Sequence, residues 1–245
     1  MTLRFDFTNH EMRYYMKLVF KICALIFIFG APQAFAKKKD PLLPAYYEYM
    51  KTTKRFNDCE FDTKYGSDYR RNDKKTKHLK GLVEGAHFTK GVQTGKYGNT
   101  GGLEFDLDYV LKKFPNHASA LIVMAELQQK PKFESRRKKD RADLLWPTTE
   151  CYFFKAMQLQ PNDASVHLVI AIYYHRNKNY KIADRHYQLS KQLIPHNPES
   201  HYNHGLLLVE LGEYEKALES AKRAMQLGYP LQGLKGKLVK AGAWQ

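Results

Sequence analysis

The chain has 245 residues, of which 43% are hydrophobic, and a formal net charge of +15 at pH 7. This length is sufficient for one domain with a sizeable core, and the three cysteines are too few for a scaffold that depends on disulfides. The positive charge favours an anionic partner, although a basic surface that is only solvated is the commoner case.

Residues 1–36 predict a secretory signal peptide. Lys17 and Lys21 supply the positive region, residues 22–29 the apolar region, and Ala34-Phe35-Ala36 the small-x-small cleavage motif. The apolar run is too short to cross a bilayer of about 30 Å as a helix, although an uncleaved anchor is the alternative. We therefore expect cleavage before Lys37 and a periplasmic location; the start of the chain could also be Met12 or Met16.

Cleavage would leave 36 basic against 23 acidic residues, a formal charge of +13. An exported chain meets anionic phospholipid, lipopolysaccharide or acidic proteins rather than nucleic acid. Of the cysteines, only Cys59 and Cys151 would remain, and an oxidising compartment allows one disulfide between them. One buried and one free thiol are the alternative.

Residues 37–105 are rich in glycine and predict an irregular segment of turns and short helices. A first amphipathic helix is expected after Pro44. The stretch 78–92 predicts two short helices broken near Thr89, whose hydroxyl is placed to cap the second.

Two consecutive units, residues 164–197 and 198–230, align without a gap. Ala171 lies over Gly205 and Ala183 over Ala217, and two antiparallel helices cross closely where one presents such a small residue. Turns are expected at Asn179 and at Gly212-Glu213. An earlier unit, 115–129 with 150–163, is interrupted by an insertion near 130–147. Residues 106–118 have the same pattern of a helix that ends just before Pro-Asn.

This period of about 34 residues resembles the tetratricopeptide repeat (TPR). The resemblance implies an all-α, right-handed helical solenoid of about three repeats across 106–228, and 229–245 resembles the capping helix of such an array, with Leu231, Leu234 and Leu238 on one face. Other segments, CEFDTKYGSDYR, VEGAHFT and LGYPLQGLKGKL among them, look like those of a group of small exported repeat proteins of Gram-negative bacteria.

The TPR resemblance also implies a concave groove lined by the first helix of each repeat. Its candidate peptide-binding positions are Ile122, Glu126, Gln129, Leu168, Ile172, His175, Arg176, Tyr202, Asn203, Leu206, Val209 and Glu210. Apolar residues at nominally exposed sites favour an amphipathic helix or an extended peptide as ligand. The alternative is that the N-terminal region or the insertion folds into the groove and buries them.

The insertion carries a second candidate site, a cluster of cations made of Arg136, Arg137, Lys138, Lys139 and Arg141. Such a cluster is a solvated loop by default. With Lys37 to Lys39 it would instead make a basic protein that associates with anionic lipid or polymer at the envelope surface.

The sequence offers few candidates for a catalytic or metal site. Glu84 with His87, and His201 with His204, have the spacing of metal ligands on one helix face, but two ligands are too few for a zinc site. His201 and His167 share a repeat position that TPRs normally fill with Trp, which favours packing.

Asp106 and Asp108 would point to different helix faces, and motifs of hydrolases and nucleotide-binding enzymes are missing. A hydrolase or redox factor using Cys151 or His87 is the third hypothesis. The leading expectation is a periplasmic adaptor that holds a protein or peptide and is not an enzyme, without cofactor, metal or nucleic acid.

Overall fold

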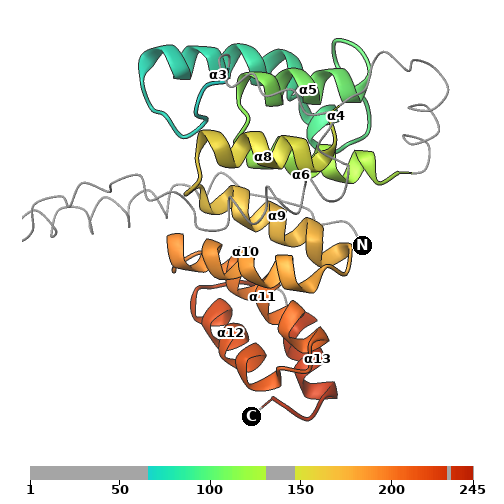
Figure 1. Cartoon of the computed structure of the whole chain (residues 1–245), viewed down its shortest axis with the longest axis vertical. Helices are drawn as coiled ribbons and strands as arrows, with labels where there is room; N and C mark the ends of the chain where they lie inside the picture. Colours follow the sequence, from blue (N-terminus) through green and yellow to red (C-terminus); the bar gives the residue numbers. More distant parts are fainter. Residues whose placement is uncertain (1–65, 131–146, 231–232, 245) are drawn as a thin grey trace, which may run out of the picture. The chain divides into compact units, whose positions relative to one another are not determined.

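The structure, a computed structural model, describes residues 66–130, 147–230 and 233–244, all within one compact unit, Asp40–Gln245. The described residues form helices, turns and loops without a β-strand, so the expected all-α class is confirmed. The helices are α3 (Lys74–His87), α4 (Lys90–Gln93), α5 (Leu103–Lys113), α6 (Ala118–Gln128), α8 (Thr149–Leu159), α9 (Ala164–Arg176), α10 (Tyr180–Leu193), α11 (Pro198–Glu210), α12 (Tyr214–Gln226) and α13 (Gly233–Lys240) (Figure 1).

Several expectations fall on residues outside these ranges. They are the signal peptide, the helix after Pro44, Cys59, Leu231 and the cations between 136 and 141. Within the described ranges, every helix is too short or too polar to cross a membrane.

The helix break near Thr89 is confirmed, because α3 ends at His87 and α4 begins at Lys90. Two details of that prediction are wrong. The first helix has 14 residues and is not short, and the Thr89 hydroxyl makes no capping hydrogen bond to α4. At the other end of α3, Asp73 caps the helix by accepting a hydrogen bond from the Thr76 amide.

The helices α9 and α10 pack as a pair, as do α11 and α12 (Figure 1). Asn179 and Glu213 are the residues before α10 and α12, so the two expected turns are confirmed. Each turn passes through a left-handed residue, Lys178 with φ 58° and Gly212 with φ 76°. The similarity between the two units is therefore present in the backbone conformation of the turn as well as in the sequence.

A second turn recurs three times, where one residue separates the end of a helix from a proline. These C-cap residues, Phe114, Gln160 and Ile194, have φ/ψ of −134°/80°, −139°/83° and −133°/84°. A following proline disfavours the helical conformation for the residue before it, which stops each of these helices at the same point.

The next helix then begins after a polar cap, whose side chain satisfies backbone amides that have no partner within the helix. His117 caps α6, Asp163 caps α9 and Asn197 caps α11.

The core is divided between two clusters of buried side chains. One extends over α3 to α10 and includes Leu207 of α11, and the other extends over α11 to α13. The small residues lie where helices cross: Ala171, Ala183 and Ala217 are fully buried. At Gly205 a Cβ atom would collide with the Leu234 side chain of α13. This contact, with Leu234 and Leu238 both buried, holds α13 against the last helix pair.

Candidate functional site

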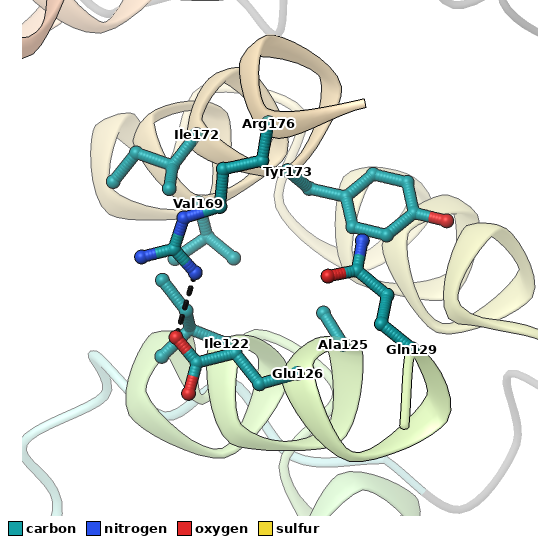
Figure 2. A pocket seen from close by; sticks show the side chains of 8 residues that line it. All are labelled: Ile122, Ala125, Glu126, Gln129, Val169, Ile172, Tyr173 and Arg176. Atoms are coloured by element: carbon teal, nitrogen blue, oxygen red, sulfur yellow. Dashed lines mark hydrogen bonds and ion pairs between the residues drawn. The ribbon is translucent and has the colours of Figure 1, made fainter. Parts of the chain in front are cut away.

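A hollow of about 200 Å³ lies between α6 and α9, the first helices of successive units (Figure 2). Its lining consists of Ile122, Ala125, Glu126, Gln129, Val169, Ile172, Tyr173 and Arg176. Five of these residues, Ile122, Glu126, Gln129, Ile172 and Arg176, were predicted as groove positions from sequence. The structure brings them together from two helices that the insertion separates in sequence.

The hollow has an apolar floor and a polar rim. Ile122, Val169 and Ile172 form the floor. On one side of the rim the Arg176 guanidinium donates a hydrogen bond of 2.7 Å to the Glu126 carboxylate, and Gln129 and Tyr173 stand on the other side (Figure 2). The hydroxyl of Tyr173 donates to Glu150 of α8 at 3.0 Å, which fixes the ring as a wall of the hollow.

The size of this hollow limits what it can hold. Sites for small molecules and cofactors usually enclose about 300–1,000 Å³. The space of about 200 Å³ in this hollow includes open solvent, and its enclosed part has room for only about one water-sized group. The hollow is therefore too shallow to enclose a small molecule, and it offers an apolar contact surface for one side chain of a larger ligand. Because the side chains of Glu126 and Arg176 are 49% and 40% exposed, their ion pair adds about 0–1 kcal/mol and separates easily.

Three apolar groove candidates are less accessible than the sequence indicated. Leu168 and Ile172 are 5% and 7% exposed and belong to the main core, because α9 packs against α6, α8, α10 and α11. Tyr202 is 9% exposed and stacks on Tyr229, with ring centroids 4.6 Å apart. Leu206 and Val209 are partly buried against the second core cluster.

The polar groove candidates mainly bond to each other or to their own helix. Nε2 of His175 lies 3.2 Å from the Glu210 carboxylate, which links α9 to α11. Burial lowers the pKa of His175, and Glu210 partly opposes that shift. Asn203 donates its amide to the carbonyl of Glu199 one turn earlier, so it is not held toward a ligand as a clamp residue would be.

Two lining residues that sequence reasoning missed, Val169 and Tyr173, lie on the same face of α9 as Ile172 and Arg176. The third, Ala125, lies three residues after Ile122 on α6. Helical periodicity around the chosen positions was a signal that would have found all three.

The histidine pairs do not form metal sites. His201 bonds to the carbonyl of Pro195, whereas His204 bonds to Asp184. Glu84 accepts from Tyr69, and His87 bonds to Asp106. Across the described ranges, no group of three or more His, Cys, Asp or Glu side chains is arranged to hold a metal ion.

The two aspartates of α5 point to different faces, as expected. Asp106 is fully buried and accepts from the amides of Asn99 and Thr100. Asp108 accepts from the Tyr152 hydroxyl at 2.7 Å. Both join helices together and do not face the hollow.

Cys151 is fully buried and disulfide-bonded. The other two cysteines of the chain lie outside the described residues, so its pairing with Cys59 stays a prediction.

No family model matches the chain, and no curated protein matches it either. The functional argument therefore depends on the geometry of the chain itself.

Proposed function

We propose that this protein is an exported TPR-type solenoid that holds a segment of another protein against α6, α9 and α11. The hollow between α6 and α9 receives one aliphatic side chain of that segment. The observation that carries the proposal is the convergence of five residues, chosen from repeat position alone, on one hollow with an apolar floor.

The chemistry of the hollow describes the ligand. Its floor offers no hydrogen-bonding groups, so the side chain that contacts it is Val, Ile or Leu, and its partial burial contributes less than the about 1.5–3 kcal/mol of a fully buried side chain. The formal charge of +13 that would remain after cleavage favours an acidic segment around this anchor. Arg176 can exchange its exposed bond to Glu126 for one to a carboxylate of the ligand.

The periplasmic location is part of the same proposal and depends on the signal peptide of residues 1–36. Mass spectrometry of the protein purified from its native envelope is expected to find Lys37 as the first residue. Retention of residues 22–29 in the native protein would contradict export by cleavage.

The binding test is a substitution that closes the hollow without disturbing the core. Ile172 is unsuitable because it is buried, and a glutamate there would unfold α9. Gln129 is exposed at the rim, so Gln129→Trp fills the mouth and leaves the floor intact. Gln158 on α8 is also exposed and lies outside the hollow, so Gln158→Trp is the matched control.

The probe is a set of short acidic synthetic peptides with a central isoleucine, compared with the same peptides carrying aspartate there. Fluorescence anisotropy is expected to show binding of the isoleucine set alone, weakened at least about tenfold by Gln129→Trp and unchanged by Gln158→Trp. Equal binding of both peptide sets, or equal effects of both tryptophans, would contradict the proposal.

A further inference from the structure

A second surface, remote in sequence from the hollow, gathers positive charge where two helix ends meet. The segment that leads into α3 lies beside the end of α5, since the Ser67 amide donates a hydrogen bond of 2.8 Å to the Lys113 carbonyl. We call this surface the basic corner; its members are Arg70, Arg71, Lys74, Lys75, Lys77, Lys80, Lys112 and Lys113.

Part of this charge is neutralised within the protein. Arg70 makes two hydrogen bonds to Asp163, of 3.0 and 3.1 Å, and Lys112 lies 2.6 Å from Asp108. By contrast, Lys74, Lys75 and Lys77 are exposed and have no acidic partner among the described residues. Three cations therefore stand together on the outer side of α3.

These lysines stand at the amino end of α3, where the partial positive charge of the helix disfavours cations. The Asp73 carboxylate caps this end, but the first turn itself holds lysines and no acidic residue. The stability of α3 therefore does not account for the three lysines.

Besides the lysines, the exposed face of α3 carries His78, Leu82 and two glycines. Leu82 is 59% exposed, and Gly81 and Gly85 have open space around them. The two carboxylates nearby bond within the protein: Asp73 accepts from the Thr76 amide, and Glu84 accepts from the Tyr69 hydroxyl. The α3 face therefore combines unpaired lysines with one protruding leucine.

We propose that the basic corner docks the protein onto a membrane surface rich in anionic phospholipid. Lys74, Lys75 and Lys77 lie among the phosphate groups, and Leu82 enters the boundary of the acyl chains. A soluble polyanion would satisfy the lysines but would offer nothing to Leu82, which is why lipid is the partner that fits. This surface shares no residue with the hollow, so docking is independent of the proposed function.

The test compares two triple variants of the full chain that lose the same net charge. The first is Lys74→Gln, Lys75→Gln and Lys77→Gln. The control is Lys181→Gln, Lys222→Gln and Lys240→Gln, which removes three exposed lysines from α10, α12 and α13. The probe is a vesicle of phosphatidylcholine with 30% phosphatidylglycerol, and flotation measures the bound fraction.

At low salt the corner variant is expected to lose about 100-fold in partitioning, since each basic residue near such a surface contributes roughly fivefold. The control should lose only a few-fold. Leu82→Ser should remove the binding that persists at 0.5 M salt, because screening spares the apolar contact. Pure phosphatidylcholine vesicles should not bind the wild-type chain.

Circular dichroism and thermal melting accompany each variant, and the corner variant should melt no lower than the wild type, since it removes cations from the start of α3. If the two triple variants lose vesicle binding equally, the binding depends only on net charge, and the proposal is overturned. Retention on heparin or DNA without binding to anionic vesicles would also overturn it, in favour of a polyanion.

Discussion

His167 and His201 occupy the same position of successive repeats, and each directs Nε2 to the carbonyl oxygen of the proline before its helix, Pro161 at 2.8 Å and Pro195 at 2.9 Å. His167 is 1% exposed, whereas His201 is partly exposed. The same hydrogen bond thus joins each helix to the turn that precedes it, but solvent reaches only the His201 ring.

This relationship predicts unequal costs of substitution. His167 is itself buried, so His167→Ala leaves a cavity as well as an unpaired Pro161 carbonyl, and should lower the free energy of unfolding by about 2–4 kcal/mol. His201→Ala should cost about 1 kcal/mol or less, because water can replace the ring. Urea denaturation measures both. A zinc-dependent change in melting that His201→Ala abolishes would contradict the packing role.

Gly205 is predicted to be irreplaceable while Leu234 is in place. A Cβ atom at 205 collides with the Leu234 side chain, so Gly205→Ala should cost about 1–3 kcal/mol. Leu234→Ala alone should also destabilise, by about 2–5 kcal/mol. The double variant should be more stable than the sum of the two losses predicts, and strict additivity in urea titrations would contradict the contact.

Lys178 is predicted to be a site of stabilisation. It adopts φ 58°, where Gly212 occupies the equivalent turn of the next repeat with φ 76°. Left-handed backbone is costly for residues with a Cβ, so Lys178→Gly should raise the free energy of unfolding by about 1 kcal/mol. Gly212→Ala should lower it by a similar amount. Chemical denaturation of both variants tests the equivalence, and a destabilised Lys178→Gly protein would refute it.

The stability of the last repeats is predicted to fall in acid. Burial, with a contribution from the Lys191 cation, lowers the pKa of His204 to about 4, against the hydrogen bond that Asp184 provides. Burial also lowers the pKa of His186 well below its usual value, and His167 beside it adds to the shift. The folded state therefore binds fewer protons than the unfolded chain, and stability is lost as pH falls below about 6.5.

His204→Leu isolates one part of this effect. Between pH 6.5 and 4 the wild type should lose as much as about 3 kcal/mol through His204, and the variant should not lose that share. At pH 7.5 the substitution should change stability little, because Asp184 is partly exposed and can be solvated. Equal acid sensitivity of the two proteins, measured by urea titration across this range, would rule out His204 as a source.

The disulfide prediction concerns Cys151, which is disulfide-bonded on α8. Non-reducing digestion of the mature protein is expected to yield one linked pair, with Cys59 as the partner. Alkylation of both thiols in the folded protein without reductant would exclude that bridge.

Sequence alone determined the helical repeat, because its signals are local. Small residues recur at one period, a proline follows each of α5, α8 and α10, and Asn179 and Gly212 mark the turns. Each signal acts through its own backbone or its nearest helix. For the same reason the helix break at Thr89 and the capping helix with Leu234 and Leu238 were predictable from local pattern. The length of α3 was missed because Gly81 and Gly85 disfavour a helix locally, and packing of Val83 against the core overrides them.

Only the tertiary structure decided which groove residues remain accessible. Whether Ile172 faces a ligand or the core depends on how closely α9 approaches its neighbours, and no pattern within α9 records that distance. The pairing of Glu126 with Arg176, and of His175 with Glu210, joins residues on different helices, and such pairs are set by the stacking of repeats. Burial and ion pairing are properties of contacts between elements, so they exist only once the helices have packed.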